Sequence, residues 1–109
     1  MTKDLIVLDE TNFDTEIGRT DGGPILVDFW ATWCGPCRIV APVIEALAGE
    51  LKGVARFGKV DVDRNPATAA KFGILSIPTL MVFKGGKAVD KIVGAQSKEA
   101  IAAMIQRHV

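Results

Sequence analysis

The chain has 109 residues, and its 13 basic and 13 acidic side chains cancel to a formal net charge of zero. This length predicts a single domain over residues 1–109. Such a domain can bury roughly two-thirds of the surface of the unfolded chain, so it needs neither a structural metal nor a structural disulfide to fold. Because the sequence has no basic stripe and no polybasic run, we expect neither nucleic acid nor a membrane surface as a partner.

The segment Met1–Leu5 lacks the apolar stretch of a secretory leader, so we expect no export signal. The apolar run at 25–30 is too short for a membrane span and contains Asp28. Two cysteines in a chain without an export signal fit a reducing compartment, where closely spaced cysteines are more often catalytic than structural. We therefore expect a cytoplasmic protein.

The first half of the chain predicts two strands and a helix. Leu5–Leu8 is a short apolar run typical of a strand. Thr11–Asp14 has the spacing of a weak capping box and predicts a helix that turns Phe13 and Ile17 inward. Pro24–Trp30 is nearly continuous in apolar residues, which indicates a buried strand.

A long helix is predicted from Cys34, because apolar residues recur there at helical spacing, at Val40, Val43, Ile44, Leu47 and Leu51. Val54–Val62 is the next predicted strand, with Gly58 as its weak point. Asn65 followed by Pro66 is typical of a helix start.

The C-terminal third predicts a hairpin and a helix. Apolar runs at 80–83 and 88–93 flank a turn with the sequence Lys-Gly-Gly-Lys. Ser97 is placed to cap a last helix, and we expect His108 to lie in a frayed tail. Strands that alternate with helices and end in a hairpin predict an α/β fold, a mixed sheet with helices on both faces.

Both cysteines lie in the segment Trp33-Cys34-Gly35-Pro36-Cys37. If it opens a helix, the spacing brings both sulfurs to one face, and Pro36 costs nothing in a first helical turn. A thiol at a helix N-terminus is favoured as the thiolate, the nucleophile of disulfide exchange. We therefore interpret Cys34 as the nucleophile and Cys37 as the resolving thiol. A structural disulfide is the plainer alternative, and a zinc site would need four ligands where the chain offers few.

Asp28 interrupts an apolar strand, and a lone buried carboxylate is costly and has a raised pKa. We interpret Asp28 as the base that accepts the proton of Cys37 when that thiol attacks. The alternative is a structural role in a hydrogen-bond or ion-pair network.

The segment Ile25–Cys37 resembles the active-site region of the thioredoxin family, and the likeness continues in family order over nearly the whole chain. The further matching segments are Lys59–Asp63, Asn65-Pro66, Phe72–Ile74, Ile77–Leu80, Phe83–Gly86 and Val93–Ala95. The resemblance implies the thioredoxin fold, a central five-stranded mixed sheet flanked by four α-helices. It also implies the base role of Asp28 and places Lys59 near it to tune it, although a lysine is by default exposed to solvent.

The resemblance further implies that the Ile77–Pro78 bond is cis and faces the dithiol. From this likeness and from the residue types we expect an apolar docking surface for substrates, made of Trp33, Gly35, Pro36, Ile77, Pro78, Val93, Gly94 and Ala95. The Ile77 backbone would pair with the substrate in strand fashion. The alternatives are an ordinary turn at Pro78 and a bulge or strand-end glycine at Gly94.

The implied activity is reduction of disulfides in other proteins by a monomer that a thioredoxin reductase recycles, with no cofactor and no metal. Two other readings stay open: an oxidant or isomerase that donates its disulfide, and a scaffold or processivity subunit that uses the same surface without turnover.

Overall fold

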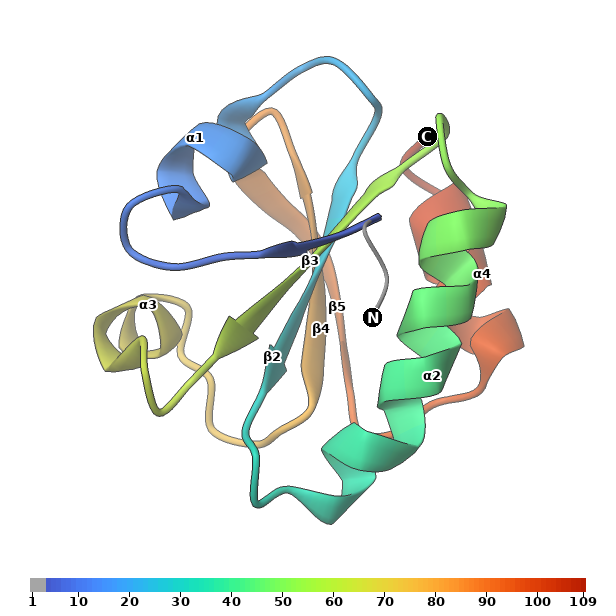
Figure 1. Cartoon of the computed structure of the whole chain (residues 1–109). Helices are drawn as coiled ribbons and strands as arrows, with labels where there is room; N and C mark the ends of the chain where they lie inside the picture. Colours follow the sequence, from blue (N-terminus) through green and yellow to red (C-terminus); the bar gives the residue numbers. More distant parts are fainter. Residues whose placement is uncertain (1–3) are drawn as a thin grey trace.

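The computed structural model describes residues 4–109 and shows one five-stranded sheet between two pairs of helices (Figure 1). Residues 1–3, on which part of the leader expectation rests, lie outside the described residues. The elements in chain order are β1 (Leu5–Val7), α1 (Phe13–Gly18), β2 (Ile25–Trp30), α2 (Gly35–Glu50), β3 (Arg56–Asp61), α3 (Pro66–Lys71), β4 (Thr79–Lys84), β5 (Lys87–Val93) and α4 (Lys98–Gln106).

The strand order is β1-β3-β2-β4-β5, so the strand that precedes the cysteines is central. β1, β3 and β2 run parallel, whereas β4 is antiparallel to β2 and to β5. α2 and α4 cover one face of the sheet, and α1 and α3 lie against the other (Figure 1). The predicted mixed sheet with helices on both faces is therefore confirmed. No helix in the described part of the chain is long and apolar enough to cross a membrane.

The alternation of side chains along β2 builds one core on each face of the sheet. Leu26 points to the face covered by α2 and α4, where it joins Val40, Ile44, Leu47, Phe57 and Ile101. Ile25, Val27 and Phe29 point to the opposite face, where they join Phe13, Ile17, Val60, Met81 and Phe83. By the same alternation Asp28 lies on the face of Leu26, towards α2.

The helix starts are only partly as predicted. Ser97 caps α4, because its hydroxyl oxygen accepts the amide of Ala100 at 3.1 Å. The capping box at 11–14 is wrong: α1 has no side-chain cap, and Asp9 Oδ1 instead accepts the Thr11 amide at 2.8 Å. An earlier turn at Asp9 thus replaces the expected cap. Asn65 does precede α3, but its Nδ2 donates to the Asp61 carbonyl and not to the helix.

The strand predicted from Val54 begins at Arg56, and the hairpin follows the expected residues. Gly85 and Gly86 form its turn with φ of 60° and 83°, values that favour glycine at both positions. The frayed tail expected at His108 is wrong. Its Nε2 lies 2.9 Å from Asp90 Oδ2, and Arg107 donates to the same oxygen at 2.9 Å. These contacts, that of His108 first, lower the pKa of Asp90 to about 2 and join the end of α4 to β5.

Gly58, expected as a weak point of its strand, is a buried point of close packing. A Cβ built on Gly58 would lie 2.6 Å from Leu8 Cδ1 and 3.3 Å from the Ile6 carbonyl oxygen. Leu8 is itself only 1% exposed, so it has little room to move. The missing side chain lets the segment after β1 pack closely against β3.

We expect Gly58→Ala to lower the free energy of unfolding by about 1–3 kcal/mol, because overpacking forces Leu8 from its place. The measurement is the urea midpoint at constant m. Gly49→Ala is the matched control: a Cβ there meets nothing within 4 Å. Because Gly49 lies inside α2, that exchange should be neutral or stabilise by up to about 1 kcal/mol. Equal midpoints for the two variants would contradict this account of Gly58.

Candidate active site

The two cysteines form a disulfide at the start of α2, just beyond the end of the central strand β2. Their Cα atoms are 5.3 Å apart, and both residues are only 3% exposed. Ala31 and the half-buried Trp30 and Ile77 pack around them. The structure therefore shows the predicted pair of cysteines in its oxidised form, with both residues covered by neighbouring side chains.

The two sulfurs differ in their surroundings. Cys34 is the N-cap residue of α2, and its Sγ accepts the backbone amide of Cys37 at 3.2 Å. An amide donor and the positive end of a helix dipole both favour a negative sulfur at Cys34. Cys37 lies inside the first turn and lines a pocket beneath the helix. The geometry thus fits different roles for the two thiols.

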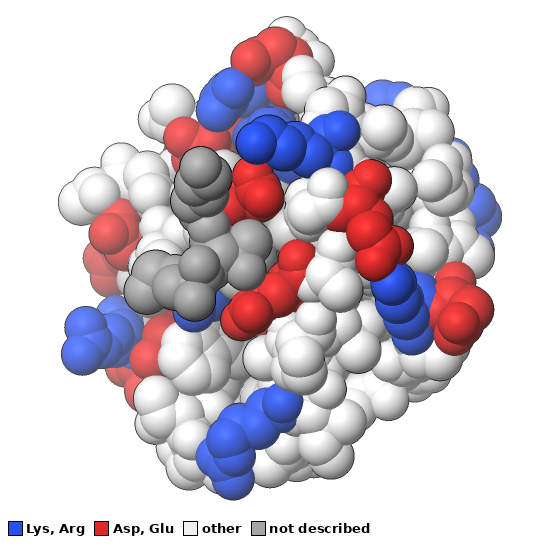
Figure 2. All heavy atoms as spheres, turned by 45° about the vertical axis from the view of Figure 1, so that its right-hand side comes forward, with Lys and Arg blue, Asp and Glu red and all other residues white. Residues whose placement is uncertain are grey.

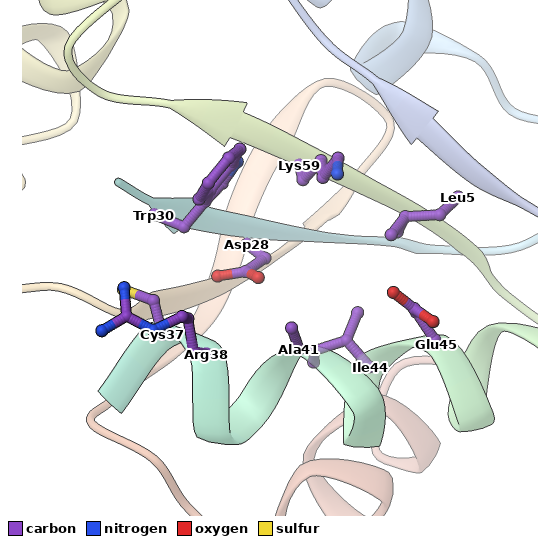
Figure 3. Close-up of a pocket in the computed structure, with 9 residues that line it drawn as sticks. All are labelled: Leu5, Asp28, Trp30, Cys37, Arg38, Ala41, Ile44, Glu45 and Lys59. Carbon is purple, nitrogen blue, oxygen red and sulfur yellow. The ribbon is translucent and has the colours of Figure 1, made fainter. Parts of the chain in front are cut away.

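The pocket under Cys37 has a volume of about 110 Å³ and also contains Asp28 and Lys59. Figure 3 shows the Asp28 carboxyl group between β2 and α2, facing the helix that carries Cys37 and Arg38. Asp28 is 5% exposed, and its Oδ1 has no hydrogen-bond partner within residues 4–109. Burial raises the pKa of Asp28 to about 7, although the positive charge of Lys59 lowers it in part. The carboxyl group therefore gains and loses a proton near neutral pH.

Lys59 is the register partner of Asp28 on the neighbouring strand β3. Within the described residues the two side chains form no ion pair. The Lys59 ammonium lies over the ring of Trp30, 5.2 Å from the ring centroid. Lys59 thus acts on Asp28 through its charge, not through a direct bond. Trp30 also packs against the cysteines.

The loop before β4 lies against the disulfide. The Ile77–Pro78 bond is cis, as the resemblance implied, and the Ile77 carbonyl oxygen lies 3.8 Å from Cys34 Sγ. In the part of the chain that is described, the Ile77 amide and carbonyl make no backbone hydrogen bond. The Pro78 carbonyl accepts the Gly94 amide at 2.8 Å, which joins this loop to the end of β5.

The expected docking residues surround the disulfide, with unequal exposure. Trp33 is 67% exposed and Val93 46%, and Pro36 and Ala95 are also exposed. Gly35, Ile77 and Gly94 are half-buried, whereas Pro78 is buried. Gly94 has a φ of 95°, so its own backbone requires a glycine whether or not a partner approaches.

The sequence did not predict two side-chain contacts that hold the connection between β2 and α2. The Trp33 indole donates from Nε1 to Asp63 Oδ2 at 2.8 Å. The Arg38 guanidinium donates to the Thr32 carbonyl at 2.8 Å. The first contact joins residues that are 30 positions apart, and nothing in the sequence around Asp63 indicates it. The second is local, between residues six positions apart. In residues 4–109 no three acidic, histidine or cysteine side chains gather as potential metal ligands.

Comparison with known proteins agrees with this geometry. The family model described as Thioredoxin matches residues 4–107. A thioredoxin of Staphylococcus saprophyticus is 54% identical over 105 residues, covering 96% of this chain and 98% of that protein. Thioredoxins of Staphylococcus haemolyticus and Staphylococcus epidermidis are 53% and 51% identical with the same coverage. With this coverage, this fold and the paired cysteines at the start of α2, the chain belongs to the thioredoxin family.

Proposed function

We propose that this protein reduces disulfides in other proteins, using the Cys34/Cys37 dithiol as its source of two electrons. The Cys34 thiolate bonds to one substrate sulfur and breaks the substrate disulfide, so that the other sulfur leaves as a thiolate and takes up a proton. Cys37 then loses its proton and attacks Cys34 Sγ, which releases the second substrate thiolate and forms the Cys34–Cys37 disulfide. A thioredoxin reductase returns the two electrons, and one proton restores the Cys37 thiol beside the Cys34 thiolate.

The observation that carries this proposal is the difference between the two sulfurs. Only Cys34 Sγ accepts a first-turn amide of α2, and Cys37 lines the pocket that contains Asp28. This arrangement supports attack by Cys34 and resolution by Cys37. A purely structural disulfide would not need an ionisable group beneath it whose pKa is about 7.

Asp28 is the proposed base of the second step. Its pKa of about 7 suits transfer at neutral pH, since a substantial fraction of the carboxyl group is then ionised and the carboxylate can still hold the proton that it accepts. The pocket that it shares with Cys37 is large enough for a water that relays the proton. Lys59 is proposed as a positioning residue whose charge keeps the pKa of Asp28 from rising further.

The proposed substrate surface consists of Trp33, Gly35, Pro36, Ile77, Pro78, Val93, Gly94 and Ala95. It is supported by the exposed apolar side chains of Trp33 and Val93 and by the Ile77 backbone, whose amide and carbonyl no other backbone group of residues 4–109 engages. An extended substrate segment can pair with that backbone regardless of its sequence, which suits a reductase with many substrates.

The partners that we propose are protein disulfides and a reductase, with neither nucleic acid nor membrane, in a cytoplasmic, single-domain monomer. Acidic and basic side chains are interspersed on the face shown in Figure 2, which has no extended basic field. A field of that kind is the electrostatic mark of nucleic-acid binding. β5 is an edge strand and carries lysines, which commonly prevent an edge strand from pairing with a strand of another molecule.

The test of the proposed function is the reduction potential of the Cys34–Cys37 couple, measured at equilibrium against a dithiol buffer. We expect a value within or below the cytosolic glutathione range of about −220 to −320 mV, so that the dithiol acts as a reductant. A value of about −120 mV would instead make the protein an oxidant. Cys34→Ser is the control: it should abolish substrate reduction, and full biological activity of that variant would favour a scaffold.

We expect Asp28→Asn to slow the second step by about 10- to 100-fold at pH 7, because the variant has no base for the Cys37 proton. With 5,5′-dithiobis(2-nitrobenzoate), the first coloured thiol released reports attack by Cys34 and the second reports resolution by Cys37. The first release should be nearly unchanged. The defect should shrink above about pH 9, where Cys37 ionises unaided. Asp14→Asn, on the exposed side of α1, is the control. Normal resolution in Asp28→Asn at pH 7 would exclude the base role.

Asp28 should also make the stability of the oxidised protein depend on pH. Its pKa is raised to about 7 in the folded protein from about 3.9 when unfolded, so the native state binds the extra proton between these values. Stability should therefore fall as pH rises from about 4 to about 7, by roughly 4 kcal/mol in total. Urea unfolding of the wild type and of Asp28→Asn across this range measures the difference, which should vanish at low pH. Parallel curves for the two proteins would refute the assignment.

A further inference from the structure

A groove of about 190 Å³ adjoins the proposed substrate surface, with which it shares Val93, and lies between the loop at 73–76 and β5. Leu75 forms one wall and is 97% exposed, the highest value among the large apolar side chains described. Val93 and Lys91 form the other wall, and Thr79 lies between them at the bottom. The chemistry of the proposed function does not use Leu75 or Lys91.

The groove adjoins the segments that lie against the disulfide. Ile77 lies against Cys34 Sγ, and the Pro78 carbonyl accepts the amide of Gly94, next to Val93. Lys91 lies two residues before Val93 on β5 and pairs in register with Met81, whereas Val93 pairs with Thr79. Met81 is four residues after Ile77, so an extended chain that starts at Ile77 reaches the level of Lys91 within about four residues, at about 3.4 Å each.

The charge in this groove is positive and uncompensated. Among residues 4–109 the Lys91 ammonium has no ion-pair partner, and the acid next to it in sequence, Asp90, points to the opposite face of β5. There Asp90 is held by Arg107 and His108. The other residues that line the groove carry no charge. A groove with apolar walls and one unpaired cation suits a segment of a partner protein that carries an apolar side chain and a carboxylate.

We propose that this groove binds the segment of a substrate protein that flanks its disulfide, and that Lys91 gives the protein a preference for an acidic residue within about four positions of the substrate cysteine. Leu75 and Val93 hold a neighbouring apolar side chain. This inference rests on the proposed function, because the occupant is the substrate of that reaction. Leu75 and Lys91 are specificity residues and take no part in the exchange of sulfur bonds.

The test uses peptides that contain one cysteine in mixed disulfide with 2-mercaptoethanol, one leucine, and a single Glu or Gln placed in turn at each of four positions on either side. Their reduction by the reduced protein is followed as kcat/KM at low ionic strength. At one or more positions Glu should be preferred over Gln by about 3- to 10-fold. The preference should fade at about 1 M salt, where exposed charges are screened.

Lys91→Glu should invert this preference, and Lys91→Gln should remove it. Lys87→Glu is the matched control, because it makes the same charge change on the same edge strand but lies outside the groove. Leu75→Ser should lower kcat/KM several-fold for Glu and Gln peptides alike. Glu/Gln ratios near one at every position, or equal ratios in Lys91→Glu and Lys87→Glu, would overturn the inference.

The neutral disulfide of 2-mercaptoethanol, which is too small to reach the groove, separates this inference from the proposed function. All the variants should reduce it at the wild-type rate. If the wild type reduced neither this disulfide nor any of the peptides, the proposed function would be wrong; reduction of the peptides without a Glu preference would reject the role of Lys91 alone.

Discussion

The burial of one carboxyl group in the central strand is the constraint around which the site is built. β2 has a neighbouring strand on each side, and between Ile25 and Phe29 all residues except Asp28 are apolar. Asp28 sits among them at 5% exposure, so its ionisation works against desolvation, and its pKa rises to about 7. The alternation of β2 directs this group towards α2. A residue unfavourable for stability at high pH is thereby placed beneath the thiol that has to lose a proton.

The second requirement is that the two sulfurs stay different although they are bonded to one another and equally buried. The helix start supplies the difference, because the N-cap position of Cys34 gives its sulfur an amide donor and the first turn places Cys37 above the pocket. The connection from β2 to α2 has to be held for this to persist. Arg38 reaches back to the Thr32 carbonyl, and Trp33 is tied to Asp63 beyond the end of β3. These two contacts fix the loop from the helix and from the sheet.

Much of this could be predicted from the chain because the signals are local. Immediate neighbours in the sequence were enough to predict the role of the paired cysteines, of Asp28 within an apolar run, and of the two glycines in the hairpin. Most of the failures concern contacts between segments that are distant in the chain. Gly58 is closely packed because Leu8 lies against it, and His108 is held by Asp90 on the preceding strand β5. Nothing in the sequence near Asp63 indicates its contact with Trp33. The start of α1 failed because Asp9, outside the expected capping box, binds the backbone first.

The two faces of β5 differ in how far they are fixed by the core, and this separates the residues of the proposed substrate groove from those of the disulfide exchange. Ile92 packs into the core beneath α2 and α4, and Asp90 binds the end of α4, so this face of the edge strand is fixed. Lys91 and Val93 point to the other face and stay exposed, beside a loop that also lies against the disulfide. Changes on the exposed face can alter what lies next to the sulfur without disturbing Asp28, which is two strands away across β4. A central strand that must not change and an edge strand that can change thus allow substrate preference to vary while the exchange reaction stays the same.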